Sequence, residues 1–229
     1  GKSTVTKEIA YHLLQRNQTV GVIALEESVR ESIRSILGIA ISKKLNDEDV
    51  RKEIKPKDIQ KAYDDFNTRL YFYDHFGSLN GNDILANIRY LAVACKCKYI
   101  ILDHITIVLS GLDGDDRKNL DVTVTKLRSL CQELNIAIIM VSHLKRLEGN
   151  RDHVDGVQIS LGHLRGSGSI AHLSNLCIGL ERNQQGDNPN EMLVRILKNR
   201  FNGKTGLVDT LHYDDETGRI LNRTQLSDF

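Results

Sequence analysis

Short apolar runs alternate with longer segments of helical periodicity along the first two-thirds of the chain. The apolar runs, rich in β-branched residues, cover residues 19–25, 70–73, 98–108 and 136–142. Runs of this kind are typical of strands buried on both faces of a parallel sheet. Apolar residues recur at helical spacing in the segments 5–13, 84–94 and 120–134, and a charged helical stretch covers 46–65. This order predicts an α/β fold, a mostly parallel twisted sheet flanked by helices.

The last third of the chain has a different pattern. Strands are expected at 176–181, 192–198 and 206–213, the last forming a hairpin with 219–220, and we expect them to extend the sheet as antiparallel edge strands. A polar segment with little periodicity, 145–165, separates the two halves. Loops of this length inside a compact domain are usually functional or mobile.

Composition narrows the class of protein. At 229 residues the chain is predicted to form a single domain, 1–229, and its net charge of +1 argues neither for nor against nucleic acid. The four cysteines lie in apolar segments without C-x-x-C spacing, which indicates buried thiols in a reducing compartment. No apolar run is long enough to cross a membrane. We expect a cytoplasmic protein without a membrane partner, with a targeting segment upstream of residue 1 as the open alternative, because the chain starts inside a motif.

The first four residues, Gly1-Lys2-Ser3-Thr4, match the end of the phosphate-binding loop G-x-x-x-x-G-K-[ST]. In the complete motif the lysine reaches the β and γ oxygens of a nucleoside triphosphate and the hydroxyl binds Mg²⁺. Lys2 and Ser3 hold these positions, and the helix predicted to follow points its N-terminus at the phosphates. A four-residue match also arises by chance, so an accidental string at the chain end is the alternative.

Three strand ends carry candidate catalytic groups. Tyr99 to Leu102 form an apolar strand that ends in Asp103, the position of the second Mg²⁺ carboxylate in such ATPases. Glu26 follows the first strand and is the candidate base for the attacking water, while Glu27 would point the other way. The alternative is that both glutamates are solvated residues capping the next helix.

His143 closes the strand predicted at 136–142. A polar residue at this strand end can sense the γ-phosphate and relay its loss to the segment that follows. A hydrogen-bonded histidine without such a role is the alternative.

Six strings add a more specific pattern. They are LEES at 25–28, ILDHI at 101–105, SHLK at 142–145, LRGSG at 164–168, LERNQQGD at 180–187 and ILKNRFNGKTG at 196–206. In this order, and over nearly the whole chain, they resemble the helicase domain of the bifunctional phage primase-helicases. That family is related to the mitochondrial Twinkle-type helicase and, more distantly, to the DnaB-like hexameric helicases.

The resemblance implies a RecA-like ATPase that forms a ring, usually a hexamer, with ATP or a dNTP between subunits and single-stranded DNA in the channel. By motif, Lys2, Ser3 and Asp103 bind phosphates and Mg²⁺, with Gly1 and Thr4 completing the loop. Glu26 is then the catalytic base and His143 the γ-phosphate sensor.

The resemblance also assigns residues to the subunit interface. Arg200 matches an arginine finger that reaches the neighbour's γ-phosphate, and Lys198 would project to the same face of its strand. Arg182 and Tyr213 match a pair that sandwiches the nucleobase. Without the family, Lys198 and Arg200 would be solvent-facing charges on an edge strand.

Two segments are expected to bind DNA. Lys145, Arg146 and Arg151 supply charge in the first, and Arg165, Gly166 and Ser167 contact phosphate in the second. With little aromatic interleaving, contact should be largely independent of sequence. The family commonly has a basic or amide side chain shortly after LRGSG, whereas this chain has Ala171 and His172, which puts one channel contact in doubt.

The chain begins inside the phosphate loop, so we expect an upstream linker and primase region to belong to a longer protein. A replicative DNA polymerase is a further expected partner, in the host cytoplasm of a phage rather than the mitochondrial matrix. One rival is a RecA-type recombinase or another DNA-binding ring ATPase, such as a clock-type ATPase, that does not unwind. Another is a nucleotide-binding module without turnover.

Overall fold

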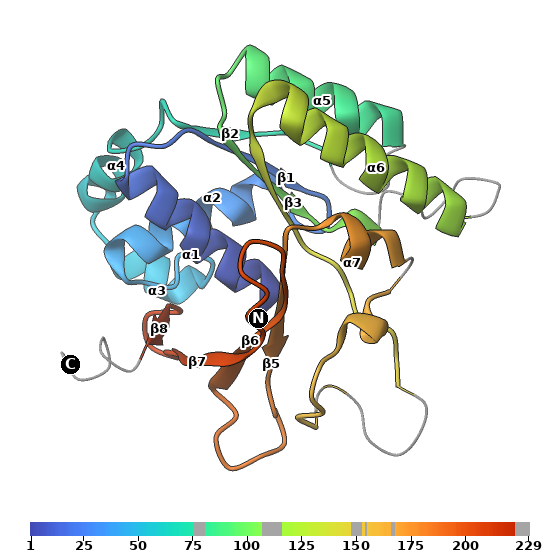
Figure 1. The fold of residues 1–229 in the computed structure, drawn as a ribbon. Coiled ribbons are helices and arrows are strands. Elements are labelled where there is room, and N and C mark those ends of the chain that lie inside the picture. The colour runs from blue at the N-terminus through green and yellow to red at the C-terminus, as the bar shows by residue number, and fades with distance from the viewer. Residues whose placement is uncertain (76–80, 107–115, 148–152, 154, 166–167, 223–229) are drawn as a thin grey trace.

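The structure, a computed structural model, describes residues 1–75, 81–106, 116–147, 153, 155–165 and 168–222 (Figure 1). A parallel sheet lies between two layers of helices, and a second sheet lies below it in this view. None of the described helices combines the length and apolar character needed to cross a bilayer.

Four parallel strands form the first sheet, in the order β2-β1-β3-β4. They are β1 (Val20–Ala24), β2 (Leu70–Phe72), β3 (Tyr99–Asp103) and β4 (Ala137–Met140). All four coincide with predicted apolar runs, so the parallel α/β core is confirmed. The central position of β1 and β3 follows from their sequences, since both are apolar on each face.

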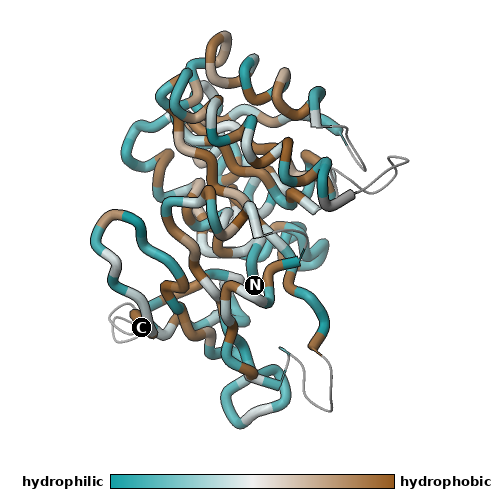
Figure 2. Tube along the Cα trace, turned by 45° about the vertical axis from the view of Figure 1, so that its right-hand side comes forward, coloured by the Kyte–Doolittle hydropathy of each residue, from teal (hydrophilic) through white to brown (hydrophobic). Residues whose placement is uncertain are grey.

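Side chains of the central strands alternate between two cores. Ile23, Ile100 and Leu102 pack with the helices α5 (Gly81–Val93), α6 (Asp116–Leu134) and α7 (Gly168–Leu173) on one face. Val22 and Ile101 pack on the other face with α1 (Lys2–Gln15), α2 (Val29–Ile41) and α4 (Pro56–Asp64). In Figure 2 brown, apolar segments concentrate along these strands and inner helix faces.

The helices next to the first strand begin with recognisable caps. Ser28 and Glu31 form a capping box at the start of α2. Asp47 caps the short α3 (Glu48–Glu53), and Pro56 opens α4. The cap of α2 therefore comes from Ser28, and the capping role that the alternative gave to Glu26 and Glu27 is wrong.

The second sheet is antiparallel, with the order β5-β6-β7-β8. Its strands are β5 (Leu176–Glu181), β6 (Glu191–Asn199), β7 (Gly206–Tyr213) and β8 (Ile220–Asn222). The expectation that these strands extend the parallel sheet is wrong, because among the described residues they form a sheet of their own. Apolar alternation identified the strands, but their pairing partners depend on where the chain returns in space.

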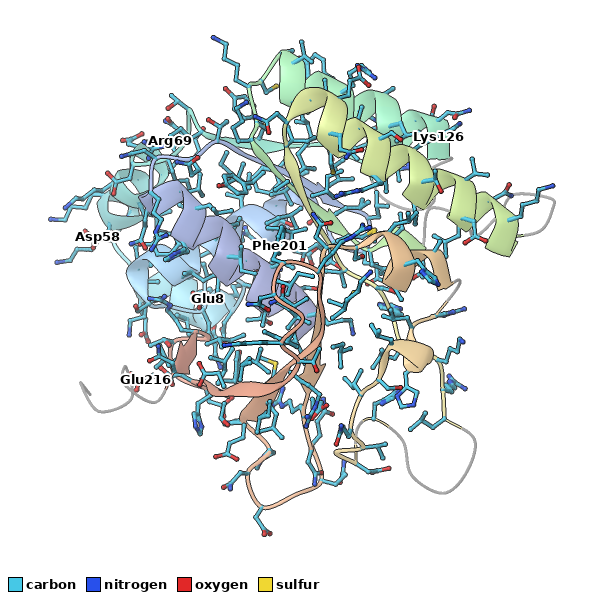
Figure 3. All side chains as sticks on the ribbon, viewed as in Figure 1. Glu8, Asp58, Arg69, Lys126, Phe201 and Glu216 are labelled. Carbon is cyan, nitrogen blue, oxygen red and sulfur yellow. The ribbon has the colours of Figure 1, made fainter. Side chains whose placement is uncertain are left out.

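An ion pair joins the second sheet to the first helix. Arg219 donates to the Glu8 carboxylate from Nε at 3.2 Å and from a terminal nitrogen at 3.0 Å. The Ile220 amide donates to the same carboxylate at 3.0 Å. Figure 3 labels Glu8 on α1. The antiparallel sheet is thereby held close to the N-terminal helix, which carries the phosphate-loop residues.

The strand expected over 98–108 is shorter than its apolar run. β3 ends at Asp103, and residues 107 and 108 lie outside the described part. Ile105 is fully buried, and its amide donates to the Val141 carbonyl at 3.0 Å. Continued burial after the strand ends explains why the run looks like one long strand.

The four cysteines are free thiols, as expected, although only Cys97 is buried and the others are half-buried. Burial raises the pKa of the Cys97 thiol to about 12. This thiol is therefore protonated and unreactive at neutral pH.

Candidate functional site

The N-terminus of α1 forms the phosphate end of the candidate site. Gly1 precedes the helix, and its carbonyl accepts from the Val5 amide at 3.1 Å. Lys2 is exposed, and Ser3 and Thr4 are half-buried in the first turn. Unpaired amides and the helix dipole make this end favourable for an anion.

Asp103 lies beside this helix end. It pairs with Ala24 at the end of β1, and its carbonyl accepts from the Leu25 amide at 2.8 Å. The Asp103 carboxylate is near enough to Gly1, at the start of the helix, to interact with it electrostatically. Asp103 is therefore close to the phosphate-loop residues, as the sequence predicts for a metal carboxylate. A hydroxyl and a carboxylate are hard oxygen donors, so the chemistry of Ser3 and Asp103 fits Mg²⁺.

Three adjacent strand ends bring a carboxylate and two imidazoles together. Glu26 Oε1 lies 2.7 Å from His104 Nε2, and Glu26 Oε2 lies 4.0 Å from His143 Nε2. The two imidazole rings are 3.8 Å apart between centroids. The structure therefore brings Glu26, Asp103 and His143 to one edge of the sheet, as the sequence predicts.

His143 is held in its neutral form. Burial lowers the pKa of His143, and the charges of His104 and Lys2 lower it further, against the opposing effect of Glu26. A neutral imidazole at physiological pH can donate one hydrogen bond and accept another. This property suits a residue that contacts a phosphate oxygen without acting as a permanent charge.

His104 and Thr106 belong to this cluster, although the sequence reasoning did not single them out. His104 is 5% exposed, and its Nδ1 lies 2.6 Å from Thr106 Oγ1. The chain Thr106–His104–Glu26 orients the Glu26 carboxylate. The available signal was the histidine directly after the aspartate in ILDHI, at a strand end already expected to carry catalytic groups.

Glu27 has a different environment from Glu26. Lys7 Nζ lies 2.6 Å from its carboxylate, and the Ser32 hydroxyl donates to it as well. These contacts tie α1 to the start of α2. Glu27 is thus engaged within the scaffold, whereas Glu26 is directed to the histidines.

Lys198 and Arg200 differ in their contacts. The Lys198 ammonium donates to the carbonyls of Ala171 at 2.6 Å and His172 at 2.8 Å, at the end of α7. Arg200 lies beyond the end of β6 and is exposed, beside Phe201, which is 79% exposed and labelled in Figure 3. Two of the three N–H groups of Lys198 are therefore used within the subunit, and the geometry leaves Arg200 as the projecting cation.

Arg182 and Tyr213 are neighbours, as the base-sandwich prediction requires. The Arg182 guanidinium carbon lies 6.0 Å from the centre of the Tyr213 ring, and Lys44 Nζ lies 5.4 Å from it. Arg182 also donates to the Pro189 carbonyl and to Asn190 Oδ1. A base between two stacking partners needs two contacts of about 3.5 Å each, so Arg182 and Tyr213 would have to separate slightly to admit one.

The segment after His143 returns to it through a short antiparallel bridge. Leu144 pairs with Leu164, the Lys145 amide donates to the His163 carbonyl at 2.7 Å, and the Arg165 amide donates to the His143 carbonyl at 2.8 Å. Lys145, Arg146 and Arg165 are all exposed. The two predicted DNA-binding segments therefore meet next to the candidate sensor. Arg151, Gly166 and Ser167 lie outside the described residues.

A buried glutamate anchors the same segment to the second sheet. The Ile159 amide donates to Glu181 Oε1 at 2.9 Å, and Arg195 Nε donates to that oxygen at 2.7 Å. Glu181 and Ile159 are 5% and 4% exposed. Glu181, from the ERNQ string, thus fixes the later part of the segment 145–165, around Ile159 and close to Arg165.

Replacing Glu181 by alanine should destabilise the domain, because the buried Ile159 amide would lose its acceptor. The expected loss in free energy of unfolding is about 1–3 kcal/mol. Denaturant unfolding of Glu181→Ala measures it, with Glu216→Ala, an exposed residue labelled in Figure 3, as the control expected to stay within about 0.5 kcal/mol. Equal stability of the two variants would contradict the anchoring role.

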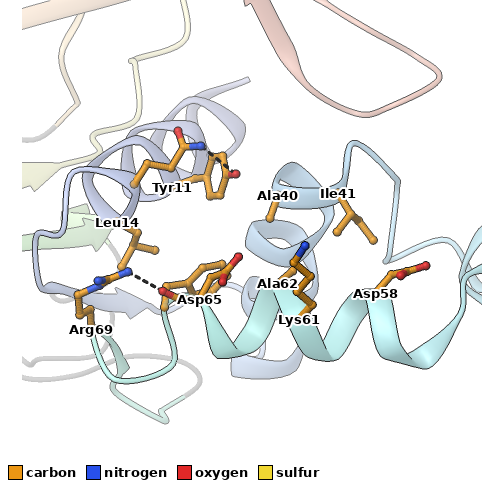
Figure 4. Close-up of a pocket in the computed structure, with 11 residues that line it drawn as sticks. Tyr11, Leu14, Ala40, Ile41, Asp58, Lys61, Ala62, Asp65 and Arg69 are labelled. Atoms are coloured by element: carbon orange, nitrogen blue, oxygen red, sulfur yellow. Dashed lines mark hydrogen bonds between the residues drawn. The ribbon is translucent and has the colours of Figure 1, made fainter.

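A separate cavity of about 510 Å³ lies between α1, α2 and α4 (Figure 4). Tyr11, Leu14 and Arg69 are among its lining residues. Tyr11 and Leu14 come from the last two turns of α1, whereas Lys2 and Ser3 begin the helix. The cavity is therefore distinct from the phosphate end.

The fold and these residues define a phosphate-loop NTPase domain of the RecA-like class. The model of the DnaB-like helicase C terminal domain matches residues 1–222, and the chain belongs to this family. This confirms the relationship inferred from the six strings.

One curated relative and two solved structures illustrate the relationship. The DNA helicase/primase of Enterobacteria phage T3 is 37% identical over 224 residues, which are 95% of this chain and 40% of that protein. A DnaB-like replicative helicase, solved in a study of its interactions with primase, superposes with a TM-score of 0.76 at 18% identity, covering 93% of this chain and 52% of that one. A KaiC-like protein from Pyrococcus horikoshii OT3 superposes with a TM-score of 0.63 at 16% identity, covering 96% of this chain and 84% of that one. A helicase and a KaiC-like protein thus share this fold, so the family match is what separates the two classes.

Proposed function

We propose that this domain is the NTP-hydrolysing motor of a ring-forming replicative helicase that moves along single-stranded DNA and separates a duplex. The hydrogen bond from the Arg165 amide to the His143 carbonyl carries the proposal. It joins a segment predicted to bind DNA directly to a residue predicted to sense the γ-phosphate. A shift of His143 on loss of phosphate would move Arg165 with it. A nucleotide-binding module without DNA coupling has no need of this contact.

The phosphate end binds ATP or a dNTP in this proposal. Lys2 contacts the β and γ oxygens, the first-turn amides near Gly1 and Thr4 contact phosphate, and Ser3 and Asp103 hold Mg²⁺. When bound, the ion would neutralise part of the negative charge of the triphosphate. The exposed side chain of Lys2 supplies positive charge for the phosphates.

Glu26 orients and deprotonates the attacking water. Its second carboxylate oxygen lies towards His143, and its first is held by His104. The half-exposed Glu26 side chain is accessible to water, while the nearly buried His104 keeps its direction fixed. Neutral His143 contacts the γ-phosphate and changes its hydrogen bonding when that phosphate leaves.

Neighbouring subunits complete the site. Arg200 reaches the γ-phosphate of the adjacent subunit, and the remaining N–H of Lys198 contacts the same phosphate. Arg182 and Tyr213 stack on the base. The ring is a homo-oligomer, with a hexamer as the expected form. DNA contacts come from Lys145, Arg146, Arg151 and Arg165, with the backbone of Gly166 and Ser167.

The chain spans 40% of the T3 helicase/primase, so the proposal for the whole protein extends beyond this domain. We infer action at a phage replication fork in the host cytoplasm, with a replicative DNA polymerase as partner. The similarity to a phage replication protein supports this setting.

A forked-duplex unwinding assay on the full-length protein tests the proposed function. We expect strand separation with a hydrolysable nucleoside triphosphate and none with a non-hydrolysable analogue. DNA-stimulated hydrolysis without any strand separation would favour the RecA-type alternative. Absence of both hydrolysis and unwinding would favour a nucleotide-binding module.

Neutralising one DNA-facing cation should weaken DNA binding equally for all sequences. Each single-strand phosphate contact contributes about −0.7 to the slope of log affinity against log salt concentration. Lys145→Ala and Arg165→Ala should each flatten the slope by roughly this amount, while Lys126→Ala on α6 (Figure 3) should not. Salt titrations with labelled single strands measure the slope. Unchanged slopes in both variants would show that Lys145 and Arg165 are solvated surface charges that do not contact DNA.

A further inference from the structure

The cluster of Glu26, His104 and His143 has the composition of a metal site of a different kind from the Mg²⁺ site. Its ligand atoms, one from each residue, all lie within 4.8 Å of one another. Two imidazoles and a carboxylate are a donor set typical of Zn²⁺, whereas Mg²⁺ prefers oxygen alone. We propose that these three residues bind a borderline-soft divalent cation of the Zn²⁺ class, and that the bound ion stops hydrolysis.

The distances suit a tetrahedral ion. Zinc–nitrogen and zinc–oxygen bonds of about 2.0–2.2 Å place ligand atoms about 3.3 Å apart in a tetrahedron. Glu26 Oε1 lies 2.7 Å from His104 Nε2, and the other carboxylate oxygen, Oε2, lies 4.0 Å from His143 Nε2. Because one ligand atom from each residue lies within 4.8 Å of the other two, shifts of about 1.5 Å or less bring every pair to the required spacing.

Thr106 supplies the support that a metal-bound imidazole needs. When His104 Nε2 binds a metal, its Nδ1 must carry the hydrogen and donate to a partner. The Thr106 hydroxyl oxygen lies 2.6 Å from that nitrogen and can accept. Without metal the same hydroxyl can donate to Nδ1, because a hydroxyl serves both roles. The site thus accommodates both the metal-bound and the metal-free form of His104 without moving the backbone.

The cluster is open on one side. The side chain of His104 is 6% exposed, but those of His143 and Glu26 are 33% and 50% exposed. Three protein ligands and an accessible fourth position are typical of sites that keep a water or substrate ligand. Lys2 and Arg165 place positive charge near His143, so we expect weaker binding than at a closed structural zinc site.

The inhibition, unlike the binding, rests on the proposed function. A metal bound to the Glu26 carboxylate withdraws the lone pair that would accept a proton from water. Excess Mg²⁺ should not restore turnover, because Mg²⁺ competes poorly for imidazole nitrogen.

Zinc titration calorimetry on the purified chain in excess Mg²⁺ tests the site. Glu26→Gln and His143→Gln should each weaken zinc binding at least tenfold. Thr106→Val, which leaves all three ligands in place, should weaken it about 10–100-fold. Thr106→Ser should restore it. The matched controls are His12→Gln, an exposed histidine on α1, and Cys95→Ser, which removes the competing thiol.

Unchanged affinity in Glu26→Gln and His143→Gln, or loss of binding in Cys95→Ser, would overturn the site. Zinc binding at these residues with turnover unaffected would overturn the inhibition. Absence of turnover in zinc-free full-length protein would count against the proposed function and not against the metal site, since calorimetry measures binding without catalysis.

Discussion

Arg200→Ala is expected to lower DNA-stimulated NTP turnover of the assembled protein by about 10³–10⁵-fold, which corresponds to about 4–7 kcal/mol of barrier. In the proposed role, the guanidinium would stabilise charge that develops on the transferred phosphoryl group. Nucleotide binding should change much less, because this interaction strengthens in the transition state.

The position of Arg200 favours action on a neighbouring subunit. A Cβ added at Gly1 would lie 3.4 Å from Met192 Sδ, so the start of β6 is next to the chain's own phosphate end. Arg200 is eight positions further along, roughly 26 Å at about 3.3 Å per residue. Arg200 is thus well separated along β6 from the phosphate end of its own subunit, and its side chain is exposed.

Mixed rings test this arrangement. Inactive Arg200→Ala subunits combined with inactive Lys2→Ala subunits should recover part of the turnover, because some interfaces contain both intact halves. Lys204→Ala, an exposed cation in the same turn, is the control and should keep normal turnover alone. If co-assembled mixtures show no recovery at any ratio, the assignment in trans is wrong.

Glu26→Gln should lower hydrolysis by about 10²–10⁴-fold while nucleotide affinity stays near normal. The amide keeps the shape and polarity of the side chain but cannot accept the proton. Glu27→Gln is a matched control, since the same change is made one residue away in a carboxylate paired with Lys7. Lys2→Ala should abolish turnover because it removes the positive charge that binds phosphate. Asp103→Ala should abolish it because it removes a proposed metal ligand.

Single-turnover hydrolysis and equilibrium nucleotide binding, measured on the full-length variants, separate these effects. Glu27→Gln should hydrolyse at a rate close to that of the unmodified protein. Normal hydrolysis in Glu26→Gln together with loss in Glu27→Gln would transfer the role of base to Glu27.

Local sequence was sufficient to predict the parallel core. The strand ending in Asp103 and the strand before Glu26 are continuous apolar runs, and only a strand buried on both faces needs such a run. Parallel strands also place their C-terminal ends at one edge, so the meeting of Glu26, Asp103 and His143 could be expected before the structure was known. The strings that resemble the helicase family extended this prediction to Arg182 and Tyr213, whose proximity no local pattern implies.

Tertiary structure alone decided the features that depend on contacts between distant segments. His104 joins Glu26 across 78 positions, Lys198 binds the carbonyls at the end of α7, and the last four strands pair with one another instead of with the parallel sheet. Periodicity reports which side of an element is apolar, but it does not report which partner meets that side. The sequence by itself therefore determined the strands and most helices, the parallel arrangement of the core and the chemical groups at its edge. The fold decided their partners, because hydrogen bonds and ion pairs form only between groups that the packed chain brings within about 3 Å.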